Sequence, residues 1–90
     1  MQIQLTPKQR EIVRHAIGFD GQSRRTTRNY FVTGEGSDDY GDWKDLVSKG
    51  YARMRSGSDL TGGDDVFHVK REVALSVREK NEHLAPDFRE

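Results

Sequence analysis

The first amphipathic segment of the chain constrains the fold most, because it carries signals for both ends of a single helix. Thr6 is a favoured N-cap residue, Pro7 suits the first helical position, and Gln9 completes a capping box. Gly18 can adopt the left-handed conformation that ends many helices. Between these signals the apolar residues recur at helical spacing: Ile12, Val13, Ala16 and Ile17. The sequence therefore predicts a helix over residues 6–17 with one buried face.

Five further segments have patterns typical of regular structure. Residues 30–33 are aromatic and β-branched, which predicts a short strand. Residues 38–49 carry an apolar stripe between a serine and a glycine, which predicts a second helix capped by that serine. Residues 51–55 and 66–70 alternate in polarity on either side of a polar, glycine-containing turn, which predicts a β-hairpin. Residues 71–83 place apolar residues on one face and predict a third helix.

Ninety residues is the length of one domain. We assign residues 1–83 to a single α+β domain, with the order helix, strand, helix, β-hairpin, helix. We expect residues 84–90 to form a flexible tail unless Leu84 and Phe88 dock on the core. Because the chain is 32% apolar and 33% charged, we expect a thin core, which a partner or a second copy could supplement. The polar connection over residues 18–29 is long for a compact domain, and such loops are often functional.

The aromatic residues supply much of the apolar surface that the chain can bury. We expect Phe31, Trp43 and Phe67 in the core. Tyr30 and Tyr51 project from the opposite faces of their predicted strands, so we expect both to be partly exposed. These two tyrosines either pack over arginine side chains or form part of a protein-binding patch.

The balance of charges and the absence of cysteine narrow the range of functions. Fifteen basic and fifteen acidic residues cancel, whereas a dedicated nucleic-acid binder usually carries a net positive charge. Without cysteine the chain forms neither disulfides nor thiolate zinc sites, which fits a reducing compartment. The N-terminus has no apolar signal segment, and no stretch has the length needed to span a membrane. We therefore expect a cytoplasmic protein with no membrane partner.

Part of the chain resembles a known DNA-binding fold. The sequence LVSKGYARM at residues 46–54 resembles the winged-helix pattern, in which a helix ends at a lysine-glycine step and enters the first wing strand. Residues 66–70, leading into the helix over 71–83, resemble the second wing strand and the C-terminal helix of that fold. The resemblance covers residues 38–80. It implies a small winged-helix-like domain and, as one function, a DNA-binding regulator.

The whole chain also resembles a family of small, uncharacterised phage and prophage proteins. The resemblance rests on LTP at residues 5–7, RHAIG at 14–18, RNYFVTG at 28–34 and LTGGDD at 60–65. It implies a viral origin, and hence a location in the host cytoplasm, but it implies no mechanism.

The charges on the helix over residues 38–49 argue against DNA binding by that helix. In a winged helix this element would enter the major groove, yet its exposed side carries four aspartates and only two lysines. An acidic stripe repels the phosphate backbone, so nucleic acid is disfavoured as a partner. A separate basic patch could form from five arginines, unless these are solvated or pair with the aspartates: Arg24, Arg25, Arg28, Arg53 and Arg55.

No constellation of reactive side chains stands out in the sequence. The three histidines, His15, His68 and His83, fall on different predicted elements and have no marked carboxylate partner. His68 follows several aspartates, but the spacing of a calcium loop is absent, and we expect this residue to face solvent. The glycines before residue 38 lack the spacing of a phosphate-binding loop. The sequence therefore predicts no catalytic residue, no metal site, no cofactor and no enzyme activity.

These patterns favour a non-catalytic protein-interaction module, with a DNA-binding winged-helix regulator as the alternative. The expected partner is another protein, which the sequence does not identify, or a second copy of the chain. The candidate interaction surface combines the basic residues with the two tyrosines: Arg24, Arg25, Arg28, Tyr30, Tyr51, Arg53 and Arg55.

Overall fold

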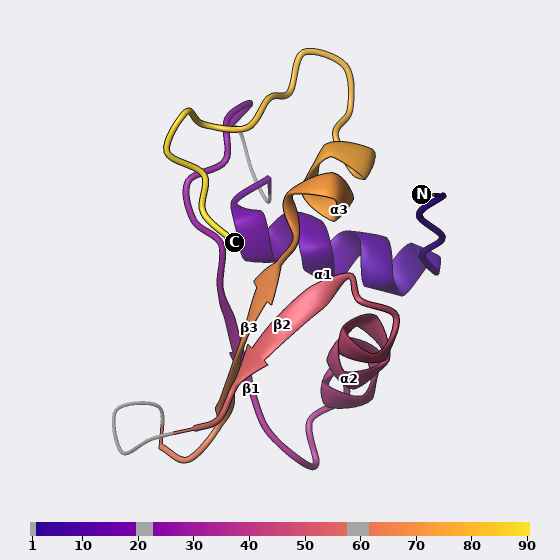
Figure 1. The fold of residues 1–90 in the computed structure, drawn as a ribbon, viewed down its shortest axis with the longest axis vertical. Coiled ribbons are helices and arrows are strands. Elements are labelled where there is room, and N and C mark those ends of the chain that lie inside the picture. The colour runs from indigo at the N-terminus through magenta and orange to yellow at the C-terminus, as the bar shows by residue number, and fades with distance from the viewer. Residues whose placement is uncertain (1, 20–22, 58–61) are drawn as a thin grey trace.

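The computed structural model describes residues 2–19, 23–57 and 62–90. These residues form three helices and three strands in the order that the sequence predicts (Figure 1), which confirms the α+β class. None of the helices in the described part of the chain is long and apolar enough to cross a membrane. The elements are α1 (Pro7–Ile17), β1 (Phe31–Thr33), α2 (Tyr40–Ser48), β2 (Ala52–Arg55), β3 (Asp65–Val69) and α3 (Arg71–Ser76).

Both ends of α1 are capped as the sequence predicts. The Gln9 N–H donates to the Thr6 hydroxyl at 3.0 Å, and the Thr6 N–H donates to Gln9 Oε1 at 3.1 Å. Gly18 ends the helix with a φ of 99°. Capping of this kind typically contributes about 1 kcal/mol, so local sequence alone favours this helix. Its buried face carries Val13, Ala16 and Ile17.

The strands form one antiparallel sheet with the order β1-β3-β2. Phe31 lies opposite Phe67, and Arg53 lies opposite His68. Because side chains alternate between the two faces of a sheet, Phe31 and Phe67 share the face that packs against Trp43 of α2. We call the opposite side the outer sheet face, and it carries six side chains: Tyr30, Val32, Arg53, Arg55, Val66 and His68.

An aromatic stack lies at the centre of the core. The ring centroid of Trp43 lies 5.4 Å from that of Phe67 and 5.2 Å from that of Phe31. Trp43 and Phe67 are fully buried, as predicted. Phe31 is partly buried and packs against the same cluster. Burying one such side chain stabilises the fold by about 1.5–3 kcal/mol, so this stack accounts for a large share of a small core.

The prediction that Tyr51 is partly exposed is wrong, because this side chain is buried with only 8% of its surface accessible. The N-terminal residues before α1 pack against it. Its hydroxyl accepts a hydrogen bond from the Gln4 N–H at 3.3 Å and donates to the Gln2 carbonyl at 3.4 Å. The strand begins only at Ala52, so the alternation of the strand does not extend back to this residue.

The second helix begins two residues later than predicted, and Ser37 is not its cap. Asp39 occupies the N-cap position, but its side chain makes no capping hydrogen bond. Instead, Asp39 Oδ1 accepts a hydrogen bond from the Thr33 hydroxyl at 2.9 Å. The backbone before the helix forms a turn in which the Ser37 N–H donates to the Gly34 carbonyl at 3.1 Å. A contact with β1 has therefore replaced the local cap.

The third helix is much shorter than the predicted range 71–83, because it ends at Ser76. Arg14 of α1 explains this difference. Its Nη1 donates to the Val77 carbonyl at 2.7 Å, and its guanidinium also makes two hydrogen bonds to Glu82, at 2.7 and 2.8 Å. Asn81 has a φ of 69°, which no α-helix accommodates. The chain after the helix wraps around this half-buried arginine rather than continuing to turn.

The residues predicted to form a flexible tail lie against the rest of the molecule. Leu84 and Phe88 are partly buried against the core, which is the condition under which we expect an ordered tail. The Ala85 N–H donates to the Thr26 hydroxyl at 2.8 Å. The guanidinium of Arg71 lies 5.8 Å from the ring centroid of Phe88. The C-terminal segment therefore runs beside residues 23–29, as Figure 1 shows.

Candidate binding surface on the sheet

The structure brings three of the predicted interaction residues to one surface. Tyr30 precedes β1, while Arg53 and Arg55 belong to β2, and all three project from the outer sheet face. The alternation of each strand places them there, because Phe31, Ala52 and Met54 project from the opposite face, which carries Phe67. Tyr51 is buried on the other side of the chain and takes no part in this surface.

The remaining three arginines lie in the connection before β1, where Arg28 reaches the border of that surface and lines a hollow with Tyr30. Arg28 lies just before β1 and donates from Nη2 to the His15 carbonyl at the end of α1, at 2.6 Å. Arg24 and Arg25 lie farther back along the same connection, where the His83 N–H donates to the Arg24 carbonyl at 2.9 Å. Residue 25 also forms an isolated parallel bridge with His83. The five arginines therefore form no single patch.

The outer sheet face exposes apolar side chains at the β1 side. Tyr30 and Val32 are 53% and 41% exposed, and both are among the largest exposed apolar residues that the structure describes. Val32 lies directly opposite Val66 of β3. A sheet that is covered on one face usually carries polar residues on the other, so this run of apolar side chains departs from the usual pattern.

The β2 side of the same face carries two exposed arginines, Arg53 and Arg55. Their side chains form no ion pair or hydrogen bond with any residue that the structure describes. The aspartates of α2 have other partners. Asp42 lies 3.2 Å from the Lys8 ammonium, and Asp45 lies 3.0 Å from that of Lys49. The alternative in which these two arginines pair with the aspartates therefore does not hold.

The pKa of Asp45 lies below its ordinary value, because it accepts a hydrogen bond from the Gln9 amide and pairs with Lys49. Asp45 therefore stays ionised at neutral pH while its charge is balanced within the molecule. The ammonium group of Lys8, in α1, neutralises the charge of Asp42 in the same way. The acidic stripe that the sequence predicts on α2 is thus partly neutralised by contacts that the sequence does not reveal.

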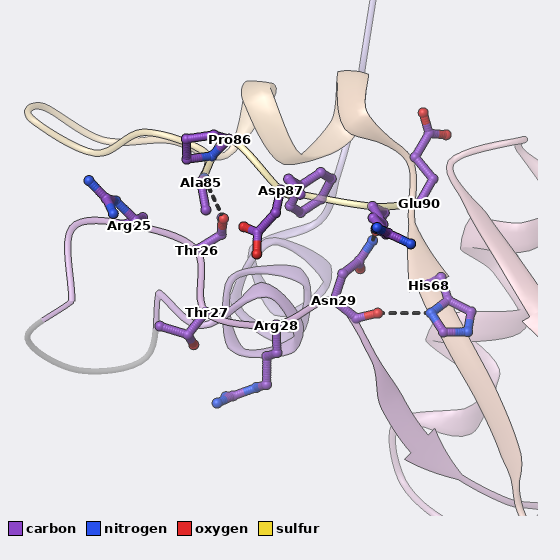
Figure 2. A pocket seen from close by; sticks show the side chains of 12 residues that line it. Arg25, Thr26, Thr27, Arg28, Asn29, His68, Ala85, Pro86, Asp87 and Glu90 are labelled. Atoms are coloured by element: carbon purple, nitrogen blue, oxygen red, sulfur yellow. Dashed lines mark hydrogen bonds between the residues drawn. The ribbon is translucent and has the colours of Figure 1, made fainter.

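The C-terminal segment covers one end of the outer sheet face. His68 is half-buried there, at the wall of a pocket of about 540 Å³ that Phe88, Arg89 and Glu90 also line. His68 Nδ1 lies 2.8 Å from the Asn29 carbonyl, and because a carbonyl only accepts, Nδ1 carries the proton (Figure 2). Nε2 is buried and has no hydrogen-bond partner among the described residues. His68 therefore projects from the outer sheet face, as predicted, but its side chain is half-buried rather than exposed to solvent.

A second hollow, of about 470 Å³, lies beside β1 and involves a residue that the sequence did not single out, Val32. No residue of β2 or β3 lines it, so it lies on the side of β1 away from the rest of the sheet. The His15 and Phe31 rings meet edge to face there, with centroids 5.9 Å apart. Arg28 also lines the larger pocket, and Figure 2 shows its side chain pointing away from Asp87. We call this hollow the edge groove, and its lining is His15, Arg28, Tyr30, Phe31 and Val32.

Within the described residues, no group of three histidine or acidic side chains is arranged to hold a metal ion. Comparison of the chain with protein-family models, with curated proteins and with solved structures gives no match.

Proposed function

We propose that this chain is a non-catalytic module that binds another protein through its outer sheet face. The observation that carries the proposal is the placement of exposed apolar residues beside two arginines that have no partner among the described residues. Tyr30 and Val32 supply apolar surface, and Arg53 and Arg55 supply charge. Tyrosine and arginine are enriched in protein–protein interfaces, where they supply much of the binding energy.

The charges of this face also indicate the character of the partner. Arg53 and Arg55 form no ion pair with a described residue, so a partner that places carboxylates over them gains two charge-assisted hydrogen bonds. The same arginines oppose a basic partner. We therefore expect the partner to present an apolar patch with acidic residues at its rim. The phage resemblance, on which the comparisons do not bear, remains a prediction about the origin of the chain.

Site-specific photo-crosslinking in the cells that express the chain tests this proposal. A photoreactive amino acid at Val32 should crosslink to one partner protein, and Arg53→Glu with Arg55→Glu should remove that product. The same amino acid at Leu75 of α3 is the matched control, because Leu75 is 39% exposed and Val32 is 41% exposed. Equal crosslinking at both positions, or none at Val32, would contradict the proposal.

DNA binding by a winged-helix-like arrangement is the second candidate function. It is favoured by the placement of α2 directly before the β2–β3 hairpin (Figure 1) and by two exposed arginines on β2, which have no acidic partner among the described residues. It is opposed by exposed Asp38 and by the net charge of zero. A gel-shift assay with random duplex at low salt distinguishes the candidates. We expect no retardation, and retardation that Arg53→Gln weakens would favour DNA binding.

A further inference from the structure

Residues 85–90, which we call the C-terminal strap, lie over one end of the outer sheet face. His68 projects from this end, and its side chain is half-buried beside Phe88 and Glu90 in the larger pocket (Figure 2). In the register of the sheet, His68 lies directly opposite Arg53. The strap therefore ends beside one of the two arginines that we propose bind the partner.

The strap is attached to the rest of the molecule by a small set of contacts. Two hydrogen bonds join it to other described residues: the Ala85 N–H donates to the Thr26 hydroxyl at 2.8 Å, and the Arg89 carbonyl accepts from Asn29 Nδ2 at 2.6 Å. Its largest apolar side chain, Phe88, is only partly buried. Single hydrogen bonds contribute modestly to stability, so the strap can open locally while the sheet stays folded.

The strap has the chemistry that the outer sheet face favours in a partner. The aromatic side chain of Phe88 is flanked by two carboxylates, those of Asp87 and Glu90. Neither carboxylate forms an ion pair with a described residue, and neither does Arg53. The closed strap thus leaves the charge of Arg53 unbalanced. A partner whose carboxylates reach Arg53 gains an interaction that the strap does not make.

We infer that the strap is a built-in competitor, which covers the His68 end of the outer sheet face in the free chain and is displaced when the partner binds. This inference rests on the proposed function. Tyr30 and Val32 are exposed while the strap is closed, so they are available for the first contact. The partner then gains the rest of the face only in chains whose strap is open, and its apparent affinity is reduced by that fraction.

Amide hydrogen exchange in the unmodified chain, followed by NMR, tests whether the strap opens by itself. The amides of Ala85 and Val69 are a matched pair, because each donates to a side-chain oxygen at 2.8 Å. Val69 belongs to β3, whereas Ala85 belongs to the strap. After correction for intrinsic rates, we expect the Ala85 amide to exchange about a hundredfold faster or more. Equal protection of the two amides would show that the strap opens only on global unfolding, and would overturn the inference.

Photo-crosslinking at Val32, in the cells that express the chain, tests whether the strap competes with the partner. Phe88→Ala weakens the closed position, so the yield of the crosslinked product should rise by about threefold or more. Phe88→Leu keeps a large apolar side chain and should change the yield by less than about 1.5-fold. Leu75→Ala is the matched control on α3, because Leu75 lies away from the strap and is 39% exposed. We expect no change of yield in this control.

The outcomes separate this inference from the proposed function. A product at Val32 whose yield Phe88→Ala leaves unchanged or lowers would overturn competition by the strap, and would still support binding at the outer sheet face. No product at Val32 in any of these chains would contradict both. If Phe88→Ala does not fold, Thr26→Val replaces it, because this change removes the hydroxyl that holds the Ala85 N–H and keeps the branched shape of the side chain. The same rise in yield is expected, and an unchanged yield would overturn the inference.

Discussion

The side chain of Asn29 takes the place of one backbone pair in the sheet, because it binds both polar backbone groups of Val69. Its Oδ1 accepts from the Val69 N–H at 2.8 Å, and its Nδ2 donates to the Val69 carbonyl at 2.9 Å. The same Nδ2 donates to the Arg89 carbonyl at 2.6 Å. One amide therefore extends the β1–β3 ladder by a residue and joins the C-terminal segment to it.

Replacing Asn29 with alanine should destabilise the fold strongly. Val69 is fully buried, so its N–H and C=O would lose their partners in a place that water does not reach. An unsatisfied buried group costs about 1–3 kcal/mol, and two groups are affected, so we expect a loss of about 2–4 kcal/mol. Urea denaturation followed by Trp43 fluorescence measures this loss. Ser37→Ala is the control and should change the stability by less than about 0.5 kcal/mol, because Ser37 is exposed and does not cap α2.

The ion pair between Arg14 and Glu82 should make stability depend on pH in the acidic range. The two hydrogen bonds from Arg14 lower the pKa of Glu82 from 4.5 to about 2. The unfolded carboxyl therefore binds a proton at a higher pH than the folded one. The stabilisation is complete above about pH 4.5 and is lost as the pH falls toward 2.

We expect this pair to account for about 2 kcal/mol of the stability lost over that range, since the Glu82 side chain is only 12% exposed. Denaturation curves at several pH values, compared between the unmodified chain and Glu82→Gln, measure the contribution. The variant should be less stable at pH 6 and should lose less stability on acidification. If the stability of the two proteins fell in parallel with decreasing pH, the contact with Arg14 would not lower the pKa of Glu82, which would contradict this prediction.

Gly18 and Gly50 offer a matched test of crowding at the end of α1. Both have positive φ, at 99° and 79°, which strains any side chain. A Cβ at Gly18 would also overlap the Thr27 hydroxyl oxygen, whereas a Cβ at Gly50 meets nothing within 4 Å. We expect Gly50→Ala to cost about 1 kcal/mol and Gly18→Ala to cost at least about 1 kcal/mol more. Equal shifts in thermal midpoint would contradict the close approach of residue 27.

The parts of the fold that sequence predicts well are those that depend on neighbours in the chain. Thr6, Gln9 and Gly18 act within α1, and the three cap it as expected. The end of α3 was missed because Arg14 reaches it from 63 residues away, and no local pattern records that contact. The start of α2 was missed for the same reason, since the side chain of Asp39 binds β1 rather than capping its own helix.

The candidate surface was predictable only where strand alternation places a side chain. Tyr30, Arg53 and Arg55 lie on the outer sheet face because strand alternation sends the residues next to them to the face of Phe67. Arg24 lies away from that surface because the chain before β1 runs beside the C-terminal segment. The periodicity of the sequence does not predict this path. The edge groove beside Val32 depends on how the end of α1 meets β1, so only the folded structure could show it.

Hydroxyl-radical footprinting of the chain, alone and bound to the partner found by crosslinking, tests most directly whether the outer sheet face is the binding surface. Tyr30 is 53% exposed in the free chain, and its rate of modification should fall by about fivefold or more in the complex. Leu75, on α3, should be modified at the same rate in both states. Unchanged modification of Tyr30, together with protection of Leu75, would contradict the account and place the partner on the helical side.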